Sequence, residues 1–250
     1  MKKIILLGIT LVSVITLNAQ SKLTVGVSVG AALPMGAYGS TDTAGGKTAV
    51  ALRGNSKDST EANGYAKTGF HFDVTAGYLF SDNIGGMVYI GGNMNSFDIS
   101  TLETQNKVTS PATASSTNYY VGQYLVGPYL SLGGSKLKID IRVLVGLVTC
   151  NTTTITYNNG ASGAFAGSST SSGNGGSGFG YQVGAGIKYN FTDKMGLLVN
   201  VGYTGSSVAY TGYTQVSDFG NNSQTYTNTT LKSTMALSIL TTTVGIAFNL

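Results

Sequence analysis

Apolar residues alternate with glycine or polar residues in eight stretches of this chain, and this period of two predicts eight β-strands. In the fifth stretch, Leu137, Ile139 and Ile141 share one face of the chain, and Lys138 and Asp140 share the other. The expected strands are 23–33, 68–80, 84–96, 119–132, 136–149, 179–191, 195–207 and about 234–250. Each is long enough to cross a membrane as a tilted strand, which takes roughly 9–11 residues.

The segments between these strands are of two kinds. Three are short polar turns, which recur at nearly equal intervals: 81–83, 133–135 and 192–194. Four are long and rich in Gly, Ser, Thr and Asn: 34–67, 97–118, 150–178 and 208–233. Within the third, residues 160–178 approach low complexity, and we expect them to be flexible. Short turns alternating with long loops are typical of an up-and-down barrel in an outer membrane.

The charged residues decide which side of the barrel is apolar. A water-soluble barrel has an apolar interior, and an unpaired charge there costs several kcal/mol. Here the face opposite the apolar one carries His71, Asp73, Lys138, Asp140, Arg142 and Lys188. The sequence therefore predicts an all-β fold, an eight-stranded antiparallel up-and-down transmembrane β-barrel with four long external loops and three short periplasmic turns. An even number of strands places the N- and C-termini on the periplasmic side.

The first residues have the pattern of a secretory signal peptide. Two lysines precede an apolar stretch over residues 4–17, and Leu17-Asn18-Ala19 offers a cleavage site. We expect residues 1–19 to be cleaved and residues 20–250 to form a single outer-membrane barrel domain. Without the two lysines, 12 basic residues face 10 acidic ones. This balance gives no reason to expect nucleic acid as a partner.

The composition agrees with a membrane barrel. Only 10% of the residues are charged, against roughly a quarter in an average soluble domain. The chain has 36 Gly, 3 Pro and no Trp, which fits extended strands better than helices. Cys150 is the only cysteine, and this excludes an internal disulfide and a Cys-based zinc site. We expect no metal and no cofactor.

Three segments carry a resemblance to a known family. They are the signal ending Leu17-Asn18-Ala19-Gln20, the Val-Gly-Val-Ser-Val-Gly run at 25–30 and the C-terminal segment 244–250, in which Phe248 lies two residues from the end. With them the chain resembles the small outer-membrane barrels of the OmpA/OmpX type, in the form common among Bacteroidetes-like bacteria. The resemblance implies integration into the cell outer membrane, contact with its lipid, and recognition of the C-terminal strand by the barrel-assembly machinery. It carries no catalytic residue across.

The charged inward face predicts a lumen that is closed by an ion-pair network. Counted from their turns, Asp73 and Arg142 lie at similar depth, and an arginine can pair with a carboxylate through two parallel hydrogen bonds. Lys138, Asp140 and Lys188 would form a second layer nearer the periplasm. On this hypothesis, Arg142→Ala increases leak through the barrel.

Aromatic residues near the ends of the strands predict two girdles at the membrane interfaces. The residues concerned are Tyr65, Phe70, Tyr78, Phe80, Tyr119, Tyr120, Tyr189, Phe191, Tyr203 and Phe248.

Three hypotheses for function remain open. We expect a monomeric, non-enzymatic barrel that presents mobile surface loops to an extracellular ligand, in envelope integrity, adhesion or surface recognition. The alternative is a small porin or channel for ions or polar solutes. A third hypothesis is a lipid-modifying barrel enzyme that uses His71, the only histidine, as its acid–base group. Bilayer conductance distinguishes the first two, and the activity of a His71→Ala variant tests the third.

Overall fold

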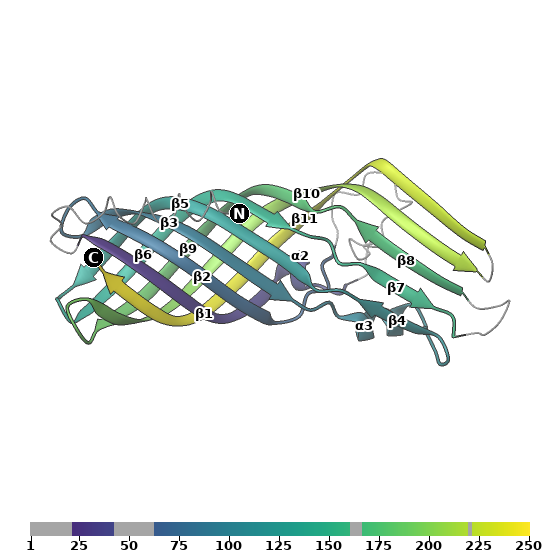
Figure 1. The fold of residues 1–250 in the computed structure, drawn as a ribbon, viewed down its shortest axis with the longest axis horizontal. Helices are drawn as coiled ribbons and strands as arrows, with labels where there is room; N and C mark the ends of the chain where they lie inside the picture. Colours follow the sequence, from purple (N-terminus) through teal and green to yellow (C-terminus); the bar gives the residue numbers. More distant parts are fainter. Residues whose placement is uncertain (1–21, 43–62, 161–166, 220–221) are drawn as a thin grey trace, which may run out of the picture.

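The computed structural model describes residues 22–42, 63–160, 167–219 and 222–250. Eight antiparallel strands close into a ring (Figure 1). In their order around the ring they are β11 (Asn222–Asn249), β1 (Leu23–Met35), β2 (Gly69–Leu79), β3 (Ile84–Asn95), β5 (Tyr119–Gly133), β6 (Leu137–Cys150), β9 (Gly176–Asn190) and β10 (Met195–Phe219). β11 pairs with both β1 and β10, which closes the ring. The predicted eight-stranded antiparallel barrel is confirmed. The expected signal peptide, residues 1–19, lies outside the described residues.

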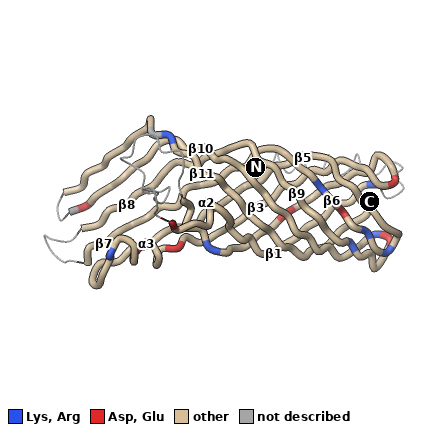
Figure 2. Tube along the Cα trace, turned by 180° about the vertical axis from the view of Figure 1, so that it is seen from behind, with Lys and Arg blue, Asp and Glu red and all other residues tan. Residues whose placement is uncertain are grey.

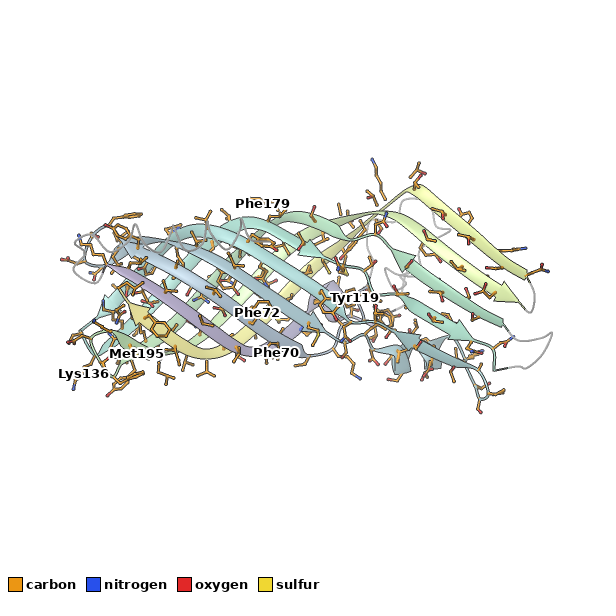
Figure 3. The ribbon with its side chains drawn as sticks, in the orientation of Figure 1. Phe70, Phe72, Tyr119, Lys136, Phe179 and Met195 are labelled. Carbon is orange, nitrogen blue, oxygen red and sulfur yellow. The ribbon has the colours of Figure 1, made fainter. Side chains whose placement is uncertain are left out.

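The apolar face of each strand points away from the barrel axis. Large apolar side chains are about half exposed all around the wall, for example Phe72, Ile139 and Val199. Figure 3 shows such side chains standing out from the ribbon, Phe179 among them. Charged residues are sparse along the middle of the barrel and lie mostly toward the two ends of the molecule (Figure 2). An apolar wall around a polar interior is the arrangement that lipid favours.

The three predicted turns lie together at one end of the barrel, which we call the turn end. They join β2 to β3, β5 to β6 and β9 to β10, and each is closed by a backbone hydrogen bond. Leu250 donates its backbone N–H to Leu23 O at 2.9 Å, so the C-terminus and the start of β1 also lie there. The turns, the first strand and the last strand thus share one end, as the alternation of short and long connections predicts.

At the opposite end, the long connections contain regular structure. β10 and β11 are 25 and 28 residues long and continue past the ring as one hairpin. Three further strands add to this hairpin in the order β8 (Gly167–Gly173), β7 (Ile155–Asn158) and β4 (Thr113–Ser116). We call these three strands, with residues 213–219 and 222–228, the extension sheet. Figure 1 shows this sheet extending beyond the end of the barrel that lies opposite the turn end.

The expectation of a flexible loop over 160–178 is therefore wrong for residues 167–173 and 176–178, which form β8 and the start of β9. The reason is that the backbone of this Ser- and Gly-rich segment finds partners on both sides, β7 and β10. Composition alone carries no information about a neighbouring strand that supplies hydrogen bonds. The expected loop 208–233 is likewise the hairpin of β10 and β11, apart from residues 220–221, which lie outside the described residues.

A bulge marks the point where the extension sheet leaves the barrel. The register of β10 against β11 shifts between Thr211 and Tyr213. Gly212, between them, has a φ of +83°, in the left-handed region that glycine adopts without strain. Bulges bend the strand that contains them. A single glycine thus separates the membrane part of β10 from its extension.

Two short helices lie in the other long connections, α2 (Gly36–Gly39) and α3 (Ile99–Gln105). Asp98 caps α3, because its carboxylate accepts a hydrogen bond from the backbone N–H of Thr101 at 3.3 Å. Among the described residues, no helix is long and apolar enough to cross a membrane.

Candidate functional site

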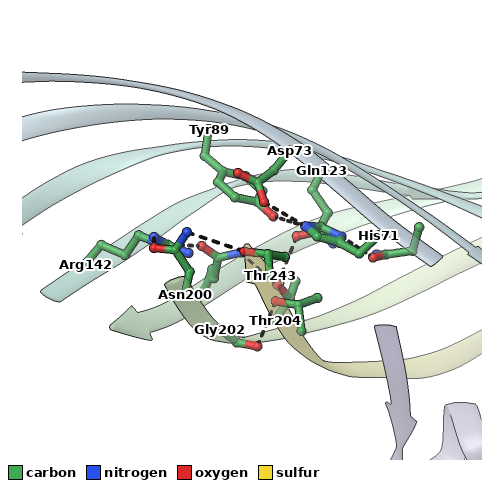
Figure 4. A network of polar contacts seen from close by, with 12 residues as sticks. His71, Asp73, Tyr89, Gln123, Arg142, Asn200, Gly202, Thr204 and Thr243 are labelled. Carbon is green, nitrogen blue, oxygen red and sulfur yellow. Dashed lines mark hydrogen bonds and ion pairs between the residues drawn. The ribbon is translucent and has the colours of Figure 1, made fainter. Parts of the chain in front are cut away.

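Polar side chains from seven of the strands form a buried network inside the barrel (Figure 4). Of the residues predicted for the lumen, His71, Asp73, Arg142 and Lys188 are at most 5% exposed. Lys138 and Asp140 are half-buried on the inward face of β6. All six predicted residues therefore face the interior, but the contacts between them differ from a network of ion pairs.

His71 on β2 contacts polar partners through both ring nitrogens. Its Nδ1 lies 2.5 Å from Asn93 Oδ1, and its Nε2 lies 3.2 Å from Asp73 Oδ2 and 2.9 Å from the Tyr89 hydroxyl. The Asp73 carboxylate can only accept, whereas the Tyr89 hydroxyl can donate to Nε2 or accept from it. With its ring fully buried and both nitrogens engaged, His71 is held as a member of this network.

Arg142 does not pair with Asp73, so the predicted bidentate ion pair is wrong. Arg142 instead donates from Nε to Gln182 Oε1 at 3.0 Å and from Nη1 to Asn200 Oδ1 at 3.3 Å. Its guanidinium lies 5.8 Å from the centre of the Tyr89 ring, a cation–π contact. Counting residues from the turns estimates the height of a side chain. It does not reveal that the Tyr89 ring lies beside Arg142 while its hydroxyl contacts His71.

Amide and hydroxyl side chains that the sequence analysis missed connect the rest of the network. Gln182 donates to the Thr204 hydroxyl at 3.3 Å, and Thr204 donates to Gln123 Oε1 at 3.0 Å. Asn200 donates to the Thr243 hydroxyl at 3.4 Å. The sequence signal that could have identified these residues is their inward position in the alternating pattern. Gly91 is a second signal, because a Cβ there would lie 2.7 Å from the Tyr89 side chain, and the glycine leaves space for that ring.

Nearer the turn end, a second polar group surrounds Lys188, again without an ion pair among the described residues. Lys188 Nζ donates to Thr24 Oγ1 and to Asn249 Oδ1, both at 3.2 Å. Asp140 Oδ1 is buried and has no hydrogen-bond partner among the described residues. A cavity of about 20 Å³ between Asp140, Arg142 and Lys188 is large enough for about one water. Among the described interior residues, His71–Asp73 is the one pair of a basic side chain and a carboxylate within 4 Å.

At the end of the barrel opposite the turn end, next to the extension sheet, an apolar core fills the interior. Its fully buried members come from inward positions of the strands and from α2; they include Ala32, Tyr38, Tyr119, Leu144, Val148, Val208, Met235, Leu237 and Ile239. Tyr38 and Tyr119 meet edge to face, with ring centres 5.4 Å apart. Tyr65 and Tyr119 were expected in the aromatic girdles, but both are buried here. Their hydroxyls bond to Gln105 Oε1 and to Gly64 O, so protein groups take the place of the water and headgroups that bond to a tyrosine in a girdle.

The extension sheet presents a polar, uncharged face next to this core. Along that face lies a groove of about 580 Å³ lined by Gln215, Ser217, Gln224, Thr225 and Tyr226, which we call the sheet groove. The face begins at the fully buried Ile155 and runs through Ser171 to the groove. No group of three or more His, Cys, Asp or Glu in the described part of the chain is placed to hold a metal ion.

A closed antiparallel ring with an apolar wall and a polar interior defines a transmembrane β-barrel. The chain belongs to the outer membrane protein β-barrel domain family, whose model matches residues 4–237. It is therefore an integral outer-membrane barrel, as the resemblance to the OmpA/OmpX type implied. No curated protein matches the chain.

Among solved structures, the chain is similar to a major outer membrane protein from Thermus thermophilus, with 10% identity, a TM-score of 0.49 and coverage of 90% of this chain and 98% of that one. It is also similar to Neisserial surface protein A, with 13% identity, a TM-score of 0.45 and coverage of 92% and 97%. A third is Ail, the attachment invasion locus protein of Yersinia pestis, with 11% identity, a TM-score of 0.42 and coverage of 90% and 98%.

Proposed function

We propose that this protein is a non-enzymatic outer-membrane barrel with a closed lumen, whose role is recognition at the cell surface through the extension sheet. The observation that carries the proposal is the sheet itself. It continues the hydrogen-bonded ladder of β10 and β11 beyond the ring, so the barrel holds it in place. A rigid polar surface on a membrane anchor suits binding, because less conformational entropy is lost when a partner is bound.

The filled interior supports a closed lumen rather than a channel. An ion that crosses the barrel would have to pass the polar network around Arg142 and then the apolar core around Leu144. Moving an ion into such an apolar region costs several kcal/mol even after relaxation. The wild-type protein in a planar bilayer is expected to give no steady single-channel current. A stable current would contradict the closed lumen and favour the alternative of a small channel.

The burial of His71 supports a non-enzymatic role. Its ring has no exposed surface, so a lipid substrate cannot reach either nitrogen. We expect His71→Ala to leave the lipid composition of the outer membrane unchanged. A change in lipid acylation that depends on His71 would favour the hypothesis of a lipid-modifying enzyme.

The proposed orientation puts the turn end in the periplasm and the extension sheet outside the cell. Cys150 is fully buried, so the native chain provides a background without an accessible thiol. A cysteine placed at Thr227, in the sheet, should react with a membrane-impermeant maleimide on intact cells. A cysteine at Asp82, in a turn and also exposed, should react only after the outer membrane is permeabilised. The reverse pattern would overturn the orientation and, with it, the role in surface recognition.

Two partners follow from the membrane location. The half-exposed apolar wall contacts outer-membrane lipid, and the barrel-assembly machinery would read the C-terminal strand, whose last residues pair with β1. We propose a monomer, because a closed ring leaves no unpaired strand edge within the membrane.

A further inference from the structure

We propose that the sheet groove is a binding site for neutral oligosaccharides. The inference rests on the proposed surface location of the extension sheet and names the class of ligand that the sheet recognises. Its support comes from the shape of the groove, the chemistry of the side chains that line it, and the hydrogen bonds that hold them.

The groove has the size of a small-ligand site. Its volume of about 580 Å³ lies within the range of roughly 300–1,000 Å³ for such sites. It lies on two paired strands, because Gln215 is opposite Tyr226 and Ser217 is opposite Gln224 in the β10–β11 register. These four side chains share one face of the hairpin, since alternate residues of a strand point the same way. A ligand laid along the hairpin would therefore meet all four.

The lining side chains combine an aromatic ring with groups that both donate and accept hydrogen bonds. The Gln224 amide has two N–H donors and an acceptor oxygen, so it can bond to two neighbouring hydroxyls of a sugar. Tyr226 is 48% exposed, so part of its ring is available to a ligand. The C–H groups on one face of a sugar ring are weakly positive, and an aromatic face is negative. Ring and amides together suit a sugar better than an apolar peptide.

Gln215 is already held in place before a ligand binds. Its Nε2 donates to Ser169 Oγ at 2.9 Å, and its Oε1 accepts from the Tyr213 hydroxyl at 3.1 Å. The same hydroxyl lies 3.0 Å from Ser171 Oγ, and Tyr213 is itself buried. Partners on β8 and β10 thus fix the orientation of the Gln215 amide. Gln215 Nε2 also donates to Ser217 Oγ at 3.5 Å, so both N–H groups of that amide are engaged and one lone pair of Oε1 remains for a ligand.

The absence of charge in the lining selects a neutral sugar. None of the five lining residues is Lys, Arg, Asp or Glu. Asp218 follows Ser217 in the strand and so points to the opposite face of the sheet. A sulfated or sialylated glycan would need cations to pair with its anionic groups. A nucleic acid would need them as well.

The test is binding of the full-length barrel, refolded in detergent, to an array that carries neutral, sialylated and sulfated oligosaccharides, followed by calorimetry on the best neutral oligosaccharide. We expect Tyr226→Ala and Gln224→Ala each to weaken binding about tenfold, which corresponds to roughly 1.4 kcal/mol. Tyr226→Phe keeps the ring and should stay within about threefold of the native affinity. Thr227→Ala, at a position that is also exposed but does not line the groove, is the matched control and should bind like the native protein.

Three outcomes would overturn the proposal: no neutral oligosaccharide binds, only sulfated or sialylated ones bind, or binding survives Tyr226→Ala and Gln224→Ala unchanged. Retained heat-modifiable migration on gels shows in each case that the variant barrel is folded. If maleimide labelling places the sheet outside the cell but the array is negative, the sugar hypothesis fails while the surface location stands. If labelling places the sheet in the periplasm, the proposed function fails with it.

Discussion

Replacement of Arg142 separates the contribution of the polar network to stability from its contribution to closure. Arg142→Met keeps most of the length of the side chain and removes both hydrogen bonds, to Gln182 and to Asn200. Each acceptor left without a partner costs about 1–3 kcal/mol, and the cation–π contact with Tyr89 adds about 0.5–1. Arg142 is a buried cation without a carboxylate partner, so its replacement also removes the cost of burying that charge and offsets part of this loss of stability. We expect the free energy of unfolding to fall by about 2–3 kcal/mol.

The lumen should stay closed when Arg142 is replaced by either Met or Ala. Arg142→Ala also shortens the side chain, which costs roughly 1–2 kcal/mol more in lost packing. The apolar core remains, however, because Leu144 follows two residues later on the inward face and is fully buried. The structure therefore revises the expectation from the sequence that Arg142→Ala increases leak. We now expect no steady conductance from either variant.

Two measurements on each protein check this reasoning, urea unfolding in lipid vesicles and planar-bilayer recording. Lys136→Ala is the control, since Lys136 is an exposed turn residue and should change neither result. A steady current through Arg142→Ala would show that the apolar core does not close the barrel. An Arg142→Met protein as stable as the native one would show that the hydrogen bonds of Arg142 contribute nothing to stability.

Three further predictions concern the wall, the cap of α3 and the bulge. Val199 faces lipid midway along β10 between Met195, which pairs with Phe248, and Tyr203. Val199→Arg should therefore cost about 2–4 kcal/mol in the same unfolding assay. An unchanged unfolding midpoint would contradict contact with lipid at this depth. Burial alone would raise the pKa of Asp98, but hydrogen bonds from Ser100 and Thr101 and the charge of Lys67 lower it below the usual 3.8. A lowered folded-state pKa contributes stability above the unfolded-state value and loses it as the pH falls through the folded-state value. Amide signals of residues 99–105 should therefore shift on acidification below about pH 3.8 in the native protein but not in Asp98→Asn; equal shifts in both would refute this role. Gly212→Val forces a β-branched residue to a φ of +83°, at roughly 1–2 kcal/mol, and should expose residues 213–228 to protease on intact cells without changing barrel unfolding.

Much of the membrane part could be predicted from the pattern of residues. The alternation along β6 identified its inward side, where Lys138, Asp140 and Arg142 do lie. The short turns were placed correctly because three polar residues between two alternating runs leave little choice of register. The partners of the inward residues could not be predicted. Arg142 and Asp73 lie on strands whose separation across the barrel depends on strand tilt, and Tyr89 comes from a third strand.

The extension sheet is a part of the fold that the pattern of residues could not predict. β8 has the sequence Gly-Ser-Ser-Thr-Ser-Ser-Gly, which has no alternation of apolar and polar residues. It is a strand because β7 and β10 lie on either side of it and pair with its backbone. The apolar core was missed for a similar reason. Its members are inward residues such as Val148 and Leu237, which in the sequence look like any other apolar residues of a strand.

The sequence by itself determined the class of this protein, the number of barrel strands, the face of each strand that meets lipid, and the turns. These follow from interactions between each residue and its solvent, lipid or interior, and such interactions impose a period of two on the chain. Only the tertiary structure decided which side chains pair in the lumen, how the apolar core closes one end, and that the Ser- and Thr-rich connections form a sheet with a groove. Those features depend on contacts between residues far apart in the sequence, and the pattern along one strand does not encode its neighbour.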